Sequence, residues 1–568
     1  MNDIRRTILW VIFGFSMVLL WDQWQVHNGN KATFFPTPAQ QAKLAGDAAS
    51  GVSQPTGVPS PVVAQGSAVV PVVETRAATK ELVQVETDLV KLSFDSEGGT
   101  LSRVELLNHD DEQKPGHKIV LLDDSKDRIY TAQTGLISSV PGVALPTHKT
   151  LMTVRPGARK LKDGDNELSI TFESAAQNGV KLIKTYTIKR GSYDMAVKHD
   201  IVNTGAQDVA PQLYFQLVRD GNKPAGESSF YSTFTGPAIY TEAKKYQKVE
   251  FADIKKKKVD VEKQSTTGYI AMVQHYFASA WILPDGLNRE ISIDAVDIGA
   301  TLADCCYRVT TISPLEVIKP GQTKSIAATF YAGPQEEKKL EALYPGLELV
   351  KDYGWLTILA KPLFWLLHQL NNLLNNWGWS IVALVVLLKA GFYWLNAHAY
   401  QSMAKMKAIN PRIMEMRERL KDNPQQMQME MMKIYREEKV NPMGGCLPIA
   451  IQIPVFIALY WVLLSTVEIR NAPWVGWIHD LSAPDPFYIL PLFMTLTTLL
   501  QTALNPAPPD PMQAKMMWIM PLAFSVMFFF FPAGLVLYWI TNNVLSIAQQ
   551  WVINTRMGVP PQFNLPKF

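Results

Sequence analysis

The sequence predicts a polytopic α-helical membrane protein that carries a large all-β domain outside the membrane. The last third of the chain consists mostly of long apolar runs, and another apolar run lies close to the N-terminus. Between them, residues 79–345 have the mixed composition of a soluble domain and contain many short, strand-like stretches. The net charge of +3 is too small to indicate a nucleic-acid substrate or an acidic ligand.

Six apolar segments are predicted to cross the bilayer. The first, residues 8–20, follows Arg5 and Arg6 and leads into Trp21 and Trp24. It lacks the small-residue pattern of a cleavage site, so an uncleaved anchor is favoured over a signal peptide. The other five approach the ~20 apolar residues that a span requires, and they comprise residues 377–395, 446–465, 487–504, 516–531 and 534–551.

The basic residues indicate on which side each loop lies. Residues 397–441 carry nine Lys or Arg against six Asp or Glu, whereas Arg470 is the only Lys or Arg in residues 466–486. Basic loops remain in the cytoplasm, so both termini are predicted to be cytoplasmic. The β domain is then periplasmic in a cell with two membranes.

The segment before the β domain is predicted to be a flexible linker. Residues 25–78 contain a stretch rich in Pro, Ala, Gly and Ser that cannot bury enough apolar surface to fold. In the domain that follows, residues 89–94 alternate as a strand does, and residues 181–189 and 193–202 predict a hairpin. Many such strands predict a sandwich.

No cofactor, metal site or enzymatic activity is expected. The three cysteines form no disulfide framework, and a bridge between the adjacent Cys305 and Cys306 would be strained. The nine histidines are scattered, and the chain lacks an HExxH motif, a Walker loop and a nucleophile elbow. The β domain is therefore predicted to be a scaffold or partner-docking domain, with a sugar-binding domain as the alternative.

A predicted helix before the second span has one apolar face. Pro362 marks its first turn, and leucines recur with helical spacing at Leu363, Leu366, Leu367, Leu370, Leu373 and Leu374. This pattern is typical of a helix that lies in the membrane interface. Packing against the β domain and extension of the second span are the alternatives.

Residues 400–438 predict two antiparallel helices joined at Asn423 and Pro424. Apolar side chains recur at intervals of three and four and so form a seam, which contains Met406, Ile409, Ile413, Met416, Leu420, Met427, Met431 and Ile434. Flexible methionines also suit surfaces that accept varied apolar partners. The seam methionines are expected to pack within the hairpin, whereas the candidates for partner contact lie off the seam at Met414, Met429 and Met432.

Lys389 interrupts the otherwise apolar second span. A lysine at mid-span costs about 2.5–3.5 kcal/mol on insertion scales, so it either stretches to the cytoplasmic headgroups or points into a hydrated cavity. The other spans favour the cavity, because they contain no Asp or Glu but hold Gln452, Thr495, Thr498, Gln501, Thr502, Asn542, Ser546, Gln549 and Gln550. Ordinary interhelical hydrogen bonding is the alternative role of these side chains. A positively charged cavity is expected to attract acidic or polar peptide segments.

Four motifs occur in order along the chain. They are YQSMAKM at 400–406, NPMGGCLPIAIQIPVFIALY at 441–460, WIHDL at 477–481 and FPAGLVLY at 531–538. Together they resemble the YidC family of membrane protein insertases, in its long Gram-negative form, over essentially the whole chain. The resemblance implies a β supersandwich similar to galactose mutarotase-like folds and a five-helix core with a hydrophilic groove open to the cytoplasm and to lipid.

The resemblance also implies site residues. The basic groove residue, usually Arg, corresponds to Lys389, the position four residues earlier, often Thr, is Val385, and the aromatic pair of the last span is Tyr538 and Trp539. Because lysine is a point charge without Arg's bidentate fork, its expected role is electrostatic. The predicted groove thus comprises Lys389, Gln452, Thr495, Thr498, Gln501, Tyr538, Trp539 and Asn542, and client contact is expected at Met414, Met429 and Met432.

The expected organisation follows from these assignments. It comprises an anchor at 1–24, a linker at 25–78, the β domain at 79–345, an amphipathic region at 346–376, the second span at 377–396, a cytoplasmic hairpin at 397–445, four further spans at 446–551 and a cytoplasmic tail at 552–568. The resemblance implies a multi-pass protein of the bacterial cell inner membrane. Its expected partners are nascent membrane proteins, the ribosome, the Sec translocon and membrane lipid, with no nucleic-acid substrate.

Three other classes of function can be compared with the same features. A small-molecule transporter needs internal repeats and broken helices, and no convincing repeat is present. A membrane-anchored sugar-binding or sugar-converting enzyme needs a glycan site in the β domain. An intramembrane protease is disfavoured, because the spans lack a Ser–His pair and an Asp pair.

Overall fold

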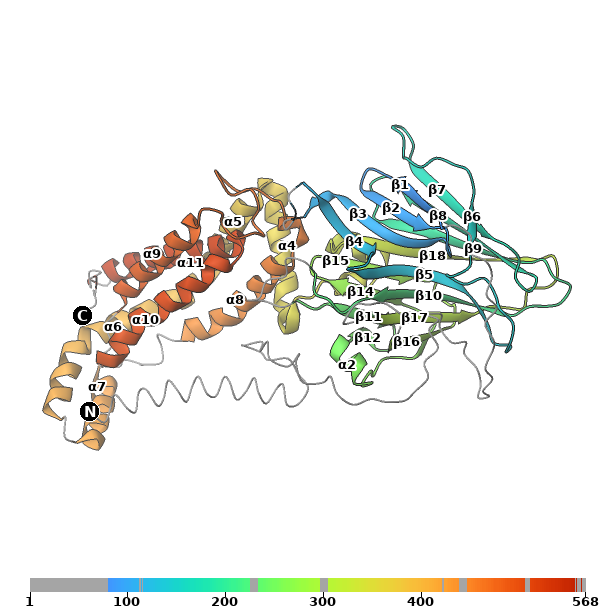
Figure 1. Cartoon of the computed structure of the whole chain (residues 1–568). Helices are drawn as coiled ribbons and strands as arrows, with labels where there is room; N and C mark the ends of the chain where they lie inside the picture. The colour runs from blue at the N-terminus through green and yellow to red at the C-terminus, as the bar shows by residue number, and fades with distance from the viewer. Residues whose placement is uncertain are drawn as a thin grey trace.

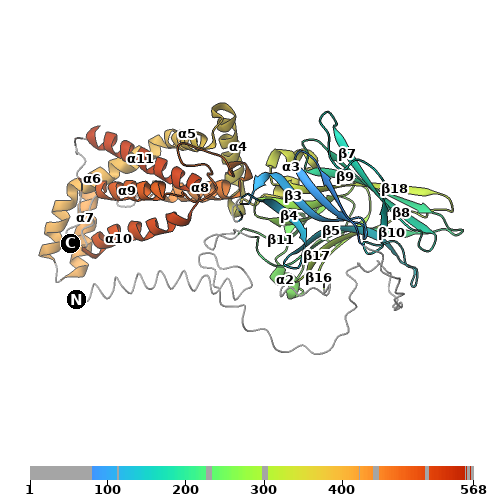
Figure 2. The same cartoon turned by 45° about the horizontal axis from the view of Figure 1, so that its top comes forward.

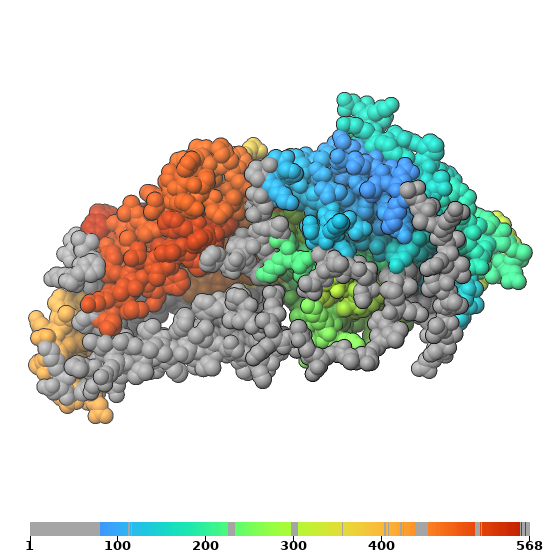
Figure 3. All heavy atoms as spheres, in the orientation of Figure 1, coloured from blue at the N-terminus to red at the C-terminus, as the bar shows by residue number. Residues whose placement is uncertain are grey.

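The computed structural model describes residues 80–556 except 112, 113, 115, 225–232, 297–304, 421, 422, 439–446 and 506–510, together with residues 558 and 563. A β domain is followed by a helical part, and the two meet at one end of the β domain (Figures 1 and 3). The predicted anchor and linker lie outside the described residues.

Two nine-stranded antiparallel sheets form the described β domain, and their facing side chains build one core. The first sheet contains, in spatial order, β1 (Leu82–Glu86), β2 (Val90–Asp95), β3 (Thr100–Asp110), β4 (Lys118–Asp124), β5 (Ile129–Ser138), β10 (Pro211–Arg219), β17 (Tyr307–Pro314), β16 (Arg289–Ala295) and β13 (Gln264–Ser265). The second contains β12 (Lys245–Lys248), β11 (Gly236–Thr241), β14 (Tyr269–Gln274), β15 (Phe277–Ile282), β18 (Thr323–Pro334), β9 (Asp194–Asn203), β8 (Val180–Lys189), β7 (Glu167–Ser174) and β6 (Met152–Val154).

The strands follow the alternation seen in the sequence. β8 pairs with β9 in antiparallel register, with Tyr186 opposite Val197, which confirms the predicted hairpin. The aromatic rings of Phe94, Phe172 and Tyr186 pack together in the core, with centroids 4.8 to 6.1 Å apart. Period-2 alternation therefore places one face of β8 in the core and leaves the other face toward solvent.

Lys184 on β8 is fully buried between the sheets. Its ammonium donates hydrogen bonds to the main-chain carbonyls of Gly98 and Thr134, each at 2.7 Å. The Thr134 hydroxyl in turn lies 2.9 Å from Nε2 of His199 on β9. Burial lowers the pKa of Lys184 to about 7 and the pKa of His199 to about 3. This polar cluster links the two sheets, and it does so at the free-energy cost of removing the lysine ammonium from water.

The helical part follows a short connection. The described elements after the sandwich are α3 (Glu337–Leu343), η1 (Leu347–Val350), η2 (Gly354–Leu356), α4 (Thr357–Leu374), α5 (Trp377–Gly391), α6 (Tyr393–Arg419), α7 (Pro424–Glu437), α8 (Leu447–Ser465), η3 (Val467–Ile469), α9 (Ile489–Leu504), α10 (Pro511–Met527), η4 (Phe528–Phe530) and α11 (Ala533–Arg556). The α6–α7 hairpin lies at the end opposite to the β domain, and α4 lies between the other helices and the β domain (Figures 1 and 2).

Within the described residues, no helix is by itself both long and apolar enough to cross a bilayer. α5 and the first part of α6 meet this requirement only together, and they are bent by 65° where they join. Apolar stretches of α8, α9 and the segment from α10 to η4 are shorter. The predicted span over 377–395 is therefore bent near its end, where the chain leaves the helix at Phe392 after Gly391, a poor helix former.

α4 differs from its predicted form. It begins at Thr357, so Pro362 lies inside the helix rather than in its first turn. Leu367 is buried, and most of the predicted leucine face packs against α5 and α8 instead of facing lipid. The exposed apolar side chains of α4 are Ile358, Leu359, Trp365, Leu373 and Leu374.

A buried ion pair links the β-domain connection to the end of α8. Lys351, whose side chain is fully buried, lies 3.4 Å from the carboxylate of Glu468 on η3. Its ammonium also lies 3.8 Å from the centroid of the Phe364 ring on α4. Lys248 of β12 pairs with Asp352 at 2.5 Å, just before η2. The connection between the two parts is therefore fixed by charged contacts on both sides.

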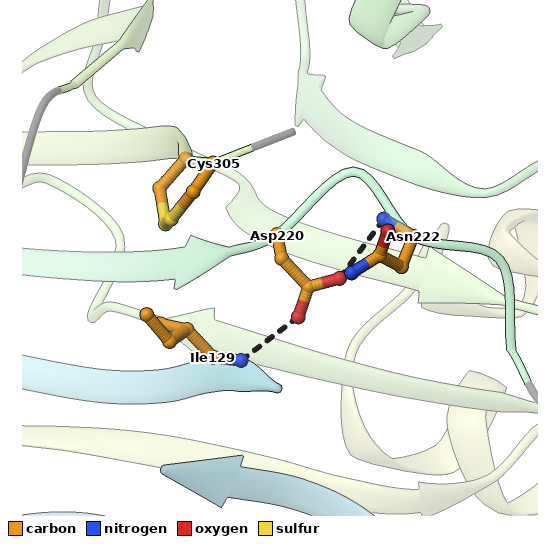
Figure 4. Close-up of a disulfide and its surroundings, with 5 residues drawn as sticks. Ile129, Asp220, Asn222 and Cys305 are labelled. Atoms are coloured by element: carbon orange, nitrogen blue, oxygen red, sulfur yellow. Dashed lines mark hydrogen bonds between the residues drawn. A yellow bond between two sulfur atoms is a disulfide. The ribbon is translucent and has the colours of Figure 1, made fainter. Parts of the chain in front are cut away.

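The structure joins the adjacent Cys305 and Cys306 by a disulfide (Figure 4). A bridge between the two adjacent cysteines was expected to be strained, and the structure nevertheless brings both side chains into one small apolar cluster with Ile129 and Val218. Successive side chains of an extended strand would point to opposite faces instead. The buried Asp220 lies nearby and accepts a hydrogen bond from the amide of Ile129 at 2.8 Å.

We expect Lys184 to make the stability of the β domain depend on pH in the alkaline range. Its folded pKa lies below that of an unfolded lysine, so the unfolded chain binds more protons between about pH 7 and pH 10. Stability therefore rises with pH in this window, by up to about 1.4 kcal/mol per pH unit. Thermal unfolding of the detergent-solubilised protein should show this rise, and Lys184→Met should flatten it. Lys189→Met, at an exposed position of the same strand, should leave the slope unchanged; an equal slope in Lys184→Met contradicts the prediction.

Candidate functional site

Lys389 lies on α5 and points into the helical part. Its side chain is only 6% exposed, and Nζ donates a hydrogen bond to Oγ of Ser546 on α11 at 2.8 Å. The hydroxyl of Ser546 in turn donates a hydrogen bond to the carbonyl of Asn542 at 2.7 Å. Lys389 makes no ion pair within the described part of the chain. This geometry does not support the alternative in which the side chain stretches to the headgroups.

A small cavity beside Lys389 brings together four predicted groove residues. It encloses about 20 Å³ and is lined by Val385, Leu388, Lys389, Phe392, Asn396, Gln452, Val455, Tyr538 and Asn542. Nε2 of Gln452 donates to Oδ1 of Asn542 at 3.0 Å and so links α8 to α11. A space of this size holds about one water molecule. The space beside Lys389 is therefore small, because the Gln452–Asn542 amide pair and the side chains of Val385, Leu388 and Val455 surround it.

The polar side chains of α9 lie outside this small cavity. The hydroxyls of Thr495, Thr498 and Thr502 each donate to a carbonyl one turn earlier on α9, at 2.8 Å. Thr498 also accepts a hydrogen bond from Nδ2 of Asn543 on α11 at 2.9 Å. Gln501 is half-buried and lines neither this cavity nor the apolar one described below. The threonine hydroxyls thus form hydrogen bonds within α9 and, at Thr498, to α11, which is the alternative role considered for them.

A larger cavity of about 800 Å³ lies between α8, α9, α10 and α11. Its lining is aromatic, aliphatic and Met-rich, and it includes Phe456, Tyr460, Trp461, Met494, Thr498, Met516, Met520, Phe524, Phe528 and Trp539. The sequence did not indicate most of these residues, because α8 and α10 are apolar all round and show no face. Their density of Met and aromatic residues was the only available signal.

Three aromatic rings separate the small polar cavity from the large apolar one. Phe456 of α8 lies 5.8 Å from the Tyr538 ring and 4.5 Å from the Trp539 ring, measured between centroids. Tyr538 and Val455 line the polar cavity, whereas Trp539 and Phe456 line the apolar cavity. We call Phe456, Tyr538 and Trp539 the aromatic partition. The two aromatic residues predicted for the groove thus face different spaces.

The hairpin packs as its spacing predicts. Ile409, Ile413, Met416 and Ile434 are buried in the seam, and the remaining seam positions pack around them. The off-seam methionines Met414, Met429 and Met432 are 47%, 67% and 46% exposed. Met429 and Met432 line a surface hollow on α7 with Gln425, Gln428, Lys433 and Arg436. This surface combines flexible apolar side chains with positive charge.

Comparison with known proteins covers both parts of the chain. Residues 82–366 match the family described as YidC periplasmic domain, and residues 369–559 match the family described as 60Kd inner membrane protein. The membrane protein insertase YidC of Cupriavidus necator is 55% identical over 560 residues, which is 98% of each chain. The membrane protein insertase YidC of Ralstonia nicotianae is 52% identical over 559 residues, again 98% of each chain. A solved active YidC insertase with its first transmembrane domain resolved is 19% identical, has a TM-score of 0.38 and covers 84% of this chain and 92% of its own.

We expect Ser546→Ala to destabilise the helical part through Lys389. The substitution removes the acceptor of a buried ammonium, and hydrogen bonds to charged groups contribute about 1.5–3 kcal/mol. The free energy of unfolding in mixed detergent micelles should fall by this amount. Ser525→Ala is a matched control, because Ser525 is equally buried but, among the described residues, donates its hydrogen bond to Pro521 of its own helix. In a Lys389→Met background the effect of Ser546→Ala should disappear; an undiminished effect there shows that Ser546 acts independently of Lys389.

Proposed function

The chain belongs to the YidC family of membrane protein insertases, and from this premise we propose that the small polar cavity at Lys389 is the closed form of a groove that receives polar segments of nascent membrane proteins. The chain is an inner-membrane protein and acts as an insertase, a family that is not a class of catalytic enzymes. The groove residues and the route described below are our proposal for how it does so.

One observation carries the proposal: the ammonium of Lys389 is buried and makes no ion pair within the described residues. A charge in such a place is costly, because only a neutral hydroxyl replaces its water. A carboxylate brought to about 4 Å gains on the order of 4 kcal/mol at an effective dielectric constant of 20. The cavity is therefore a favourable place for an acidic segment of an incoming chain.

The apolar cavity supports the second step of the route. An incoming helix that has placed its polar flank near Lys389 lies next to the aromatic partition. Passage across Phe456 and Trp539 brings its apolar side chains between α8 and α10, in the cavity of about 800 Å³. Burial of these side chains, first against protein and then in lipid, drives release. No nucleotide is needed for this sequence of events.

The α6–α7 hairpin is proposed to make the first contact. It lies at the end of the helical part opposite to the β domain (Figure 2), and it presents Met414, Met429 and Met432 to solvent. This placement suits a cytoplasmic hairpin, a periplasmic β domain and a multi-pass core of five spans after an N-terminal anchor. We also propose that the ribosome and the Sec translocon cooperate with the chain on its nascent clients.

We expect Lys389→Ala to slow the insertion of clients with acidic translocated tails by about tenfold. This factor corresponds to about 1.4 kcal/mol, a fraction of the charge-pair energy given above. The measurement is protease protection of the translocated tail in vesicles that contain the purified full chain.

Three controls make this test specific. Lys389→Arg should retain most activity, because the charge remains. Lys361→Ala, at a half-buried lysine of α4, should have no effect. A client whose tail is neutral should insert equally well with each variant. Normal insertion of the acidic client by Lys389→Ala refutes the proposed role of the charge.

We expect a photoreactive side chain at Met429 or Met432 to crosslink ribosome-bound nascent membrane proteins. Both positions are exposed and lie in the same hollow of α7. Gln426, which is also exposed but outside that hollow, serves as the matched position. Adducts of equal yield at Gln426 argue against a specific client surface.

A further inference from the structure

A second polar cavity, of about 540 Å³, lies where the β domain meets the end of α8. Its walls are the β3–β4 hairpin, the loop after β4, the β14–β15 turn and Arg470 from the segment after α8. Two hydrogen bonds join these walls: His275 Nε2 to the carbonyl of Leu464 at 3.0 Å, and Arg470 Nη2 to the carbonyl of Asp110 at 2.7 Å. Leu464 lies in the last turn of α8, so the cavity lies at the level where this apolar helix ends.

Five basic side chains line the cavity, namely Arg103, Lys114, Lys118, Arg128 and Arg470. Arg103 pairs with Asp123 at 2.7 Å, so its charge is already compensated. Arg128 instead donates to the neutral amide oxygen of Gln274 at 3.2 Å and makes no ion pair among the residues that the structure describes. Arg470 reaches the same space from the helical part. Guanidinium groups from the β domain and from the helical part thus line one cavity.

Carboxylates are present in the same cavity, which limits the choice of ligand. Glu105, Asp111, Asp123 and Asp127 contribute to its lining together with the five basic side chains. The lining therefore carries charges of both signs. A ligand that carries both a phosphate and a primary ammonium can satisfy both sets, because guanidinium forks fit phosphate oxygens and ammonium groups fit carboxylates.

We propose that this cavity binds the headgroup of a zwitterionic phospholipid that carries a phosphate and a primary ammonium. In an inner-membrane protein the end of an apolar helix lies at the headgroup region, which is where such a ligand is available. The volume of the cavity falls within the ~300–1,000 Å³ of small-molecule sites. The bound lipid would brace the β domain against the segment after α8. The site is separate from Lys389, so its test does not depend on the groove.

The test uses the full chain in detergent and an ethanolamine phospholipid with a photoreactive group close to its phosphate. In the unmodified protein, crosslinked peptides should contain Arg128 or Arg470. Arg128→Gln should lower the yield of these adducts about tenfold, as expected for loss of a charge-assisted contact. Arg155→Gln is the matched control, because Arg155 is an exposed arginine paired with Glu173 outside the cavity, and it should leave the yield unchanged.

Competition on the unmodified protein distinguishes the sources of the ligand. Unlabelled ethanolamine phospholipid should abolish the adducts, whereas choline phospholipid, which lacks ammonium hydrogens, should compete much less. Equal competition by inorganic phosphate or by an acidic peptide overturns the proposal, as does unchanged labelling of folded Arg128→Gln. Should Arg128→Gln fail to fold, the preference for ethanolamine over choline phospholipid decides: its presence supports the proposal and its absence overturns it.

Discussion

The buried ammonium of Lys389 must remain hydrogen-bonded, and this requirement sets the arrangement of the helices around it. Ser546 accepts its hydrogen bond from α11, and Gln549 on the same helix donates to the main-chain carbonyl of Lys389 at 3.3 Å. Asn542, one turn before Ser546, accepts from Gln452 and so attaches α8 to the same line of contacts. α5, α8 and α11 therefore share one polar seam, and the remaining faces of these helices can stay apolar.

This seam explains why a polar and an apolar space lie back to back. α8 and α11 contribute adjacent residues to both spaces, Val455 and Tyr538 to one and Phe456 and Trp539 to the other. A helix turns by about 100° per residue, so neighbouring side chains face different directions. The same two helices can thus hold a buried charge on one side and bound apolar surface on the other without any additional element.

The sequence predicted the features that depend on local pattern and missed those that depend on packing. The β8–β9 hairpin and the seam around Ile413 follow directly from periods of 2 and 3.5. The bend at Phe392 could not be predicted, because hydropathy stays high across it. The position of Pro362 inside α4 and the inward face of its leucines depend on contacts with α5 and α8. The size of the space at Lys389 depends on how closely α5, α8 and α11 approach one another. The sequence of one segment alone does not determine this distance.

A single helix, α6, connects the bend at Phe392 to the tip of the hairpin. α6 runs for 27 residues from just after that bend to the tip of the hairpin, a length of about 40 Å. Phe392 lies one turn after Lys389 and lines the same cavity. For a straight helix of this length, a tilt of about 10° at its first residue corresponds to a displacement of roughly 7 Å at its other end. The first turns of α6 are hydrogen-bonded to α11, through Asn396 and Gln549 at 3.4 Å and through Tyr400 and the carbonyl of Ser546 at 3.5 Å, so the position of the hairpin and the position of the helix that holds Ser546 depend on each other.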